Sequence, residues 1–254
     1  MNQKISILGC GWLGMPLAKK LIKEGHQVYG STTSPNKLSD LESKGITPFI
    51  IDIDQENNGL ATFLESDVLV INIPSKNKNG FQRLISAIEQ SALRKVVFVS
   101  STSVYPNTNG VVTEETETIP SPLREVEQLF TSNTDIQATI LRFGGLFGYD
   151  RKPGNFFKPN SIIDHPEGYV TMIHQDDCIG IIQDIISQKV WNETFNACST
   201  SHPTRREYYL NEAKKVGRTD IAFNEQSENQ YKIVSNQKLK DVLNYNFKHD
   251  DLMD

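Results

Sequence analysis

Cysteines, long apolar runs and an excess of one charge are all scarce in this sequence. Its 254 residues include three cysteines at wide and irregular spacing, which predicts neither a disulfide framework nor a metal cluster. No apolar run reaches the ~18–20 residues that are needed to cross a bilayer. The first residues also lack the charged stretch and apolar core of a signal peptide. We therefore expect a cytoplasmic location and no membrane partner.

The charge balance is mildly acidic. Lysine and arginine total 26, aspartate and glutamate total 31, and the formal net charge is −5 with the two signs interspersed. Proteins that bind nucleic acid usually present a strongly basic face. The charge balance therefore argues against a nucleic-acid partner. The partner that we expect is a small molecule, either a substrate or a cofactor. It leaves open whether the chain forms an oligomer.

Apolar strand-like runs alternate with amphipathic helical segments in the first 143 residues. The almost continuous apolar character of the runs is typical of a parallel sheet that crossover helices bury on both faces. The pattern predicts an α/β fold, a Rossmann-type doubly wound parallel sheet. The expected strands are residues 4–8, 27–30, 48–53, 67–73, 95–100 and 136–143, and the expected helices are 15–23, 36–43, 80–92 and 123–130.

The pattern changes after residue 148. Residues 149–168 are rich in Pro, Gly, Asn and Lys, which indicates loops over a ligand cleft. Helices are expected at 176–188 and, with Thr204 as its cap, at 204–216. We expect residues 1–148 to form the Rossmann core and residues 149–254 to form a small substrate-side cap that completes the same domain.

A Gly-x-Gly-x-x-Gly turn stands between the first expected strand and the first expected helix. In this position, Gly9 permits the tight turn, Gly11 lets the backbone approach a pyrophosphate, and Gly14 lets the helix pack closely. The turn predicts that residues 1–148 bind NAD(P), with Trp12 and Leu13 also at the cofactor. The alternative is a tight turn that binds nothing.

The end of the second strand bears on the choice of cofactor. An acid there would bind the ribose 2′-hydroxyl of NAD, but the sequence has Ser31, Thr32 and Thr33. These hydroxyls, with Lys37, favour the 2′-phosphate of NADP over NAD. In the alternative interpretation the segment only caps the next helix through Ser34.

Several motifs in order resemble the extended and atypical short-chain dehydrogenase/reductases, the NAD(P)-dependent epimerase/dehydratase group. The resemblance covers nearly the whole chain and lies at residues 7–14, 51–54, 99–105, 141–148, 173–177 and 195–197.

The resemblance implies roles for several further residues. It implies that Asp52 contacts the adenine, that the backbone at Ile73 and Pro74 passes the cofactor ribose, and that Ser101 orients the substrate. For Asp52 the alternative is an acid at the end of a strand that faces solvent. Ser100 is assigned to the cofactor site and Thr102 joins Ser101 as a candidate catalytic residue; for Ser100 and Ser101 a local turn is the alternative. Candidate substrate-side residues are Arg142, Lys152 and His174, and a structural histidine is the alternative for the last.

The catalytic pair of the redox-active relatives is missing. Those relatives carry Tyr-x-x-x-Lys on the helix after the serine loop, and the lysine lowers the phenol pKa for proton exchange. The matching positions here are Ile119 and Leu123 in one alignment, or Leu123 and Glu127 in the other. Two hypotheses follow: a reductase, epimerase or dehydratase with a rearranged site, acting on a small polar or nucleotide-linked substrate, or a non-catalytic protein that senses NAD(P) or regulates.

Overall fold

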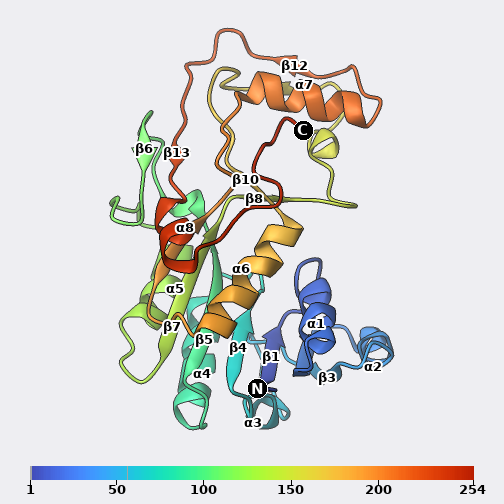
Figure 1. The fold of residues 1–254 in the computed structure, drawn as a ribbon, viewed down its shortest axis with the longest axis vertical. Coiled ribbons are helices and arrows are strands. Elements are labelled where there is room, and N and C mark those ends of the chain that lie inside the picture. The colour runs from blue at the N-terminus through green and yellow to red at the C-terminus, as the bar shows by residue number, and fades with distance from the viewer. Residues whose placement is uncertain (1, 56) are drawn as a thin grey trace. The chain divides into compact units, whose positions relative to one another are not determined.

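The computed structural model describes residues 2–55 and 57–254 (Figure 1). The strands are β1 Lys4–Leu8, β2 Gln27–Thr32, β3 Thr47–Ile50, β4 Val68–Ile71, β5 Lys95–Ser101, β6 Val111–Val112, β7 Gln137–Phe143, β8 Gly145–Phe147, β9 Ile162–Ile163, β10 Met172–His174, β11 Thr194–Ala197, β12 Ala222–Phe223 and β13 Ile233–Val234. The α-helices are α1 Gly14–Lys23, α2 Leu38–Glu42, α3 Leu60–Phe63, α4 Lys78–Glu89, α5 Pro122–Thr131, α6 Gln175–Gln188, α7 Arg205–Lys215 and α8 Gln237–Leu243. Short 3₁₀ turns occupy Pro35–Lys37 (η1), Thr102–Val104 (η2) and Pro153–Asn155 (η3).

A seven-stranded sheet has the order β11-β7-β5-β4-β1-β2-β3, and β1 pairs in parallel with both β2 and β4. From β1 the chain moves outward through β2 and β3, then returns to β4 and moves the other way through β5. Right-handed crossovers in opposite directions place α1 and α4 on opposite faces of the sheet (Figure 1). The predicted doubly wound sheet is confirmed, and its switch point lies between β1 and β4.

The first crossover follows its sequence signals closely. The helix α1 buries Leu17, Ala18 and Leu21, and Gly25 ends it with φ +91° while donating its amide to Ile22 O at 2.9 Å. The third strand is shorter than expected because the chain turns just after β3. The expected second helix is also shorter: it begins as the η1 turn, and Ser34 makes no side-chain cap bond.

Contacts divide the described chain into two compact units. The first comprises residues 1–100, 120–141 and 181–194, and the second comprises 101–119, 142–180 and 195–254. Each unit takes segments from several parts of the sequence. The expected division into 1–148 and 149–254, as parts of one domain, stays a prediction.

Three phenylalanines anchor the helices α4 and α5 in the first unit. The ring of Phe98 on β5 lies 5.7 Å from Phe81 on α4 and 5.2 Å from Phe130 on α5, centroid to centroid. Aromatic pairs of this kind contribute about 0.5–1.5 kcal/mol each beyond the burial of their area. Outside this core, the Lys78 ammonium lies 3.0 Å from the Glu125 carboxylate and joins the same two helices.

The second unit contains three short parallel pairs, β8 with β10, β9 with β12, and β6 with β13. Val170, Met172, Tyr208 and Leu252 form a buried apolar cluster in it. Thr204 caps its helix α7, as the sequence predicts, and Glu207 completes a capping box: Thr204 Oγ1 accepts from the Glu207 amide and the Glu207 carboxylate accepts from the Thr204 amide. Among the described helices, none is both long and apolar enough to cross a membrane.

Candidate functional site

The three glycines of the turn after β1 meet different surroundings. Gly9 has φ +99°, and an added Cβ there would lie 2.5 Å from the Asn72 carbonyl oxygen. A Cβ on Gly14 would collide with the carbonyl oxygen of Gly9. A Cβ on Gly11 would meet no heavy atom within 4 Å. Gly9 and Gly14 are therefore needed by the fold, whereas Gly11 leaves open space above the backbone.

Hydrogen bonds with the neighbouring strand β2 and with Asn72, which follows β4, hold this turn in place. The Gly9 amide donates to Ser31 Oγ at 3.0 Å, and the Cys10 amide donates to Ser31 O at 2.8 Å. On the other side, Asn72 Nδ2 donates to Gly9 O at 3.3 Å. Ser31 is only 1% exposed, so the structure places its hydroxyl against the turn itself.

A hollow of about 480 Å³ lies beside the turn, at the carboxyl ends of the strands next to the switch point. We call it the switch-point hollow. In doubly wound sheets, ligands bind in this position. Among the predicted cofactor residues, Trp12, Leu13, Gly14 and Ser100 lie outside its lining. The lining is Leu8, Gly9, Cys10, Gly11, Ser31, Thr32, Thr33, Ser34, Lys37, Ile51, Asp52, Ile53, Asp54, Ile73, Pro74 and Ser75.

Asp52 organises the loop that follows β3. Its carboxylate accepts from the Asp54 amide at 3.0 Å and from Gln55 Nε2 at 3.2 Å. The Asn57 side chain accepts from the Asp52 amide at 2.8 Å and donates to the Asp52 carbonyl at 2.7 Å. These bonds turn the chain after Ile50, which explains the early end of β3, and they hold Asp52 at the rim of the switch-point hollow.

The segment after β2 presents hydroxyls and a cation to the same hollow. Thr33 and Lys37 are exposed, and Thr32 Oγ1 accepts from the Ser34 amide at 3.1 Å. The sequence from Ser31 to Lys37 contains no carboxylate. This side of the switch-point hollow is therefore able to receive an anionic group.

The helix α5 carries a buried acid where the family resemblance expects a lysine in one alignment. Glu127 is 0% exposed, and its Oε1 accepts a hydrogen bond from Ser100 Oγ at 2.6 Å. Arg124 Nη1 lies 3.4 Å from Glu127 Oε2. Leu123, at the tyrosine position of that alignment, is buried. The helix thus holds Ser100 with a carboxylate and contains no tyrosine or lysine.

The two candidate catalytic residues, Ser101 and Thr102, are the first residues of the second unit. Ser101 Oγ accepts from the Ser103 amide at 3.1 Å and starts the η2 turn, and Thr102 is buried. The local turn that was the alternative interpretation of Ser101 is thus present.

Arg142 lies in a buried polar cluster of the second unit. Its Nη1 donates to Tyr105 Oη at 2.6 Å, and Tyr105 Oη donates to Asn196 Oδ1 at 2.8 Å. Burial raises the pKa of Tyr105, and the guanidinium partly offsets this rise. Because Arg142 is 5% exposed, the structure places its charge inside the unit.

Lys152 and His174 occupy different environments in the same unit. Lys152 is exposed and precedes the η3 turn. His174 is 8% exposed at the end of β10, and its ring contacts those of Phe147 and His249 at centroid distances of 5.2 and 3.6 Å.

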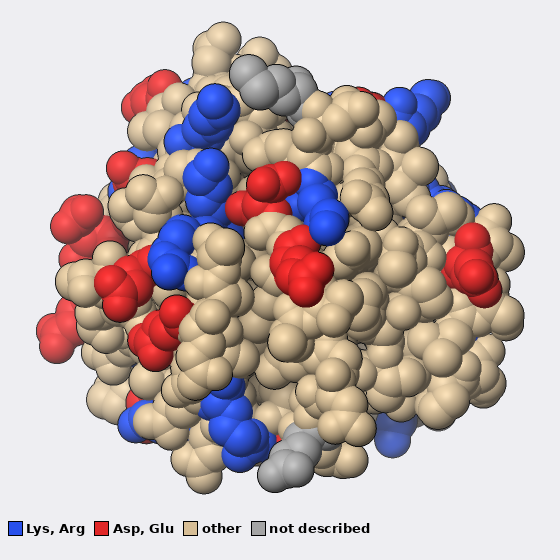
Figure 2. Space-filling model, turned by 90° about the horizontal axis from the view of Figure 1, so that it is seen from below, with Lys and Arg blue, Asp and Glu red and all other residues tan. Residues whose placement is uncertain are grey.

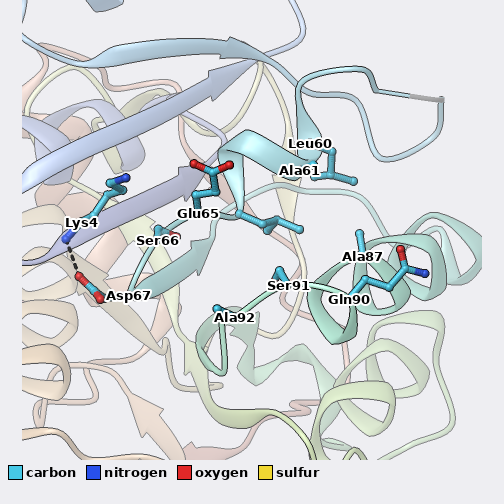
Figure 3. Close-up of a pocket in the computed structure, with 11 residues that line it drawn as sticks. Lys4, Leu60, Ala61, Glu65, Ser66, Asp67, Ala87, Gln90, Ser91 and Ala92 are labelled. Atoms are coloured by element: carbon cyan, nitrogen blue, oxygen red, sulfur yellow. Dashed lines mark hydrogen bonds between the residues drawn. The ribbon is translucent and has the colours of Figure 1, made fainter.

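A second hollow of about 670 Å³ lies at the opposite, amino-terminal ends of the strands (Figure 3). Lys4 begins β1, and its amide donates to Asp67 Oδ2 at 2.8 Å just before β4. From below, this end of the molecule shows acidic and basic side chains intermixed (Figure 2). It lacks the glycine turn, so the smaller switch-point hollow is the better candidate for a dinucleotide.

Sequence reasoning missed Asn72 and did not foresee the bond that Glu127 makes. Asn72 directly follows β4 at the switch point, and that position was the available signal. The pairing of Glu127 with Ser100 joins two residues far apart in the sequence, and no local pattern indicates it.

Comparisons with known proteins agree with this geometry. The profile of a family described as NAD(P)H-binding matches residues 9–168. Protein YeeZ of Escherichia coli (strain K12) is 29% identical over 267 residues, covering 98% of this chain and 97% of that protein.

Two solved structures share the fold at low sequence identity. A functionally unknown conserved protein from Silicibacter pomeroyi has a TM-score of 0.82 at 19% identity, covering 99% of this chain and 96% of that one. UDP-glucuronic acid 4-epimerase from Bacillus cereus, solved with NAD, has a TM-score of 0.80 at 22% identity, covering 98% and 94%. The fold that the resemblance to the short-chain dehydrogenase/reductase and epimerase/dehydratase group implies is confirmed.

Proposed function

Because the chain belongs to the NAD(P)H-binding family, we propose that it binds one nicotinamide dinucleotide in the switch-point hollow and prefers NADP(H) to NAD(H). The observation that carries this proposal is the position of the glycine turn at the rim of that hollow. The amino end of α1 follows the turn, and its first turn contains no acidic residue that would repel a pyrophosphate.

The preference for NADP(H) rests on the segment after β2. A 2′-phosphate there would meet the hydroxyls of Thr33 and Ser34 and the ammonium of Lys37. The two acids at the hollow, Asp52 and Asp54, lie in the loop after β3, and the family resemblance implies that Asp52 contacts the adenine.

The test is the variant Lys37→Ala, with Lys78→Ala as a matched control on α4, outside the switch-point hollow. A hydrogen bond to a charged group contributes about 1.5–3 kcal/mol, less when exposed, so we expect a roughly tenfold rise in the Kd for NADPH. The Kd for NADH should not change. An equal rise in the Kd for both cofactors, or no rise for either, would refute the assignment of Lys37 to the 2′-phosphate.

For the reaction, we propose chemistry of the dehydrogenase/epimerase type on a small polar or nucleotide-linked substrate. The fold shared with the Bacillus cereus epimerase supports this class. Ser101 and Thr102 are the candidate catalytic residues, and Arg142, Lys152 and His174 are the candidate substrate-side residues. No nucleic acid or membrane partner is proposed.

The second candidate is a non-catalytic protein that senses NADP(H). The buried Glu127, bonded to Ser100, favours it, because a carboxylate does not lower a phenol pKa as the lysine of the relatives does. NADPH consumption with small carbonyl compounds and UDP-sugars separates the two candidates. Turnover that Ser101→Ala abolishes supports the enzyme, whereas saturable binding without turnover supports the sensor.

A further inference from the structure

Two imidazoles and a carboxylate converge in the second unit, where β10 meets α6. Asp176 Oδ2 lies 3.4 Å from His249 Nε2 and 3.8 Å from His174 Nδ1. All three potential ligand atoms lie within 4.8 Å of one another. His174 is buried, and the side chains of Asp176 and His249 are 32% and 42% exposed, so solvent reaches one side of the group.

The backbone that carries His249 is held independently of its ring. The fully buried carboxylate of Asp177 accepts from the Lys248 amide at 2.8 Å and from the His249 amide at 3.1 Å. Ser199 Oγ donates to the His249 carbonyl at 2.8 Å. The segment is therefore fixed on both sides of the residue, which keeps the imidazole within reach of Asp176.

His174 and Asp176 are each held in a fixed orientation. His174 Nδ1 accepts from the Asp176 amide at 3.1 Å, so its lone pair points toward the Asp176 backbone, and a metal ion would take the place of this amide. The Gly148 backbone crowds the other side of the ring, since a Cβ there would lie 2.6 Å from Nε2. Tyr149 Oη donates to both oxygens of Asp176, at 3.0 and 3.1 Å, and orients the carboxylate as outer partners of metal ligands do.

We propose that His174, Asp176 and His249 bind one divalent transition-metal ion of the zinc type. Zinc bonds to nitrogen and oxygen of about 2.0–2.2 Å place tetrahedral ligand atoms about 3.4 Å apart, close to the two distances to Asp176 Oδ2. Two imidazoles with one carboxylate suit Zn²⁺ or Co²⁺ better than Mg²⁺ or Ca²⁺. On binding, the ion would take the place of the Asp176 amide at His174 Nδ1. The half-exposed His249 ring would rotate away from the His174 ring, and a water molecule would occupy the fourth ligand position of the ion.

The test begins with full-length protein that has been stripped by a chelator and then freed of it. Equilibrium dialysis against Zn²⁺ should give one ion per chain, and Co²⁺ should produce the visible absorption of a low-symmetry site. His249→Ala and Asp176→Asn should each raise the Kd at least tenfold. Asp241→Asn, an equivalent change on the exposed face of α8, should leave the Kd unchanged.

Measurements on the unaltered chain keep the proposal testable if a variant fails to fold. Paramagnetic Co²⁺ should shift or broaden the ring resonances of His174 and His249 before those of His26 and His202. Absence of Zn²⁺ binding, or binding that persists in both ligand variants, would overturn the proposal. Resonance changes that begin at other histidines would also overturn it.

Discussion

The variant Gly11→Ala tests whether Gly11 is needed for cofactor binding rather than for the stability of the fold. Gly11 is exposed, its φ lies outside the left-handed region, and an added Cβ would meet no heavy atom within 4 Å. Alanine at a compatible position reduces the conformational freedom of the unfolded chain. We therefore expect the free energy of unfolding to stay unchanged or to rise by up to about 1 kcal/mol.

The methyl group of Gly11→Ala should weaken the binding of the cofactor. It would occupy the open space above the turn, where a pyrophosphate must approach the backbone amides. Loss of one hydrogen bond from a backbone amide to a charged phosphate costs about 1.5–3 kcal/mol of binding free energy. This cost predicts a rise in the Kd for NADPH of about ten- to hundredfold.

Urea unfolding and nicotinamide fluorescence titration measure the two effects on the same preparation. Gly14→Ala is the matched comparison: its Cβ would collide with Gly9 O, so stability should fall by about 1–3 kcal/mol. A Gly11→Ala protein that binds NADPH as tightly as the unaltered chain would refute the assignment of the turn to the pyrophosphate.

Two further predictions follow from buried groups. Burial raises the pKa of the thiols of Cys10 and Cys198 to about 12, and raises that of Cys178 as well. Because the thiolate is the reactive form, thiol reagents at pH 8 should label all three only after denaturation, and labelling of the native chain would contradict this. Tyr208 Oη is buried and has no hydrogen-bond partner among the described residues, so Tyr208→Phe should raise the free energy of unfolding by about 1 kcal/mol. Urea unfolding checks it, and a loss of stability would show that the hydroxyl is satisfied.

The sequence predicts the sheet well where long apolar runs meet strong end signals. The run from Lys4 to Leu8, the glycine turn and the stop at Gly25 agree with β1 and α1. Two-residue strands such as β6 and β13 are too short to show any periodicity, and their partners lie about 120 residues away in the chain. Long-range pairing defines these strands, so local propensity could not predict them.

In the candidate site, too, some residues carry a local sequence signal and others are positioned only by long-range contacts. Gly9, Asp52 and Pro74 line the switch-point hollow; the glycine motif indicated the first of them, and the family resemblance implied the other two. The placement of Ser31 against the turn, and of Arg142 against Tyr105, depends on side-chain directions that no spacing encodes. His249 lies 75 positions after His174, and the contact that joins them depends on the buried Asp177.

The most direct test of the central claim is a titration of the unaltered chain with NADPH and with NADH, followed by nicotinamide fluorescence. We expect saturable binding of one NADPH per chain, with a lower Kd than for NADH. No saturable change with either cofactor up to near-millimolar concentration would contradict the assignment of the switch-point hollow as the dinucleotide site.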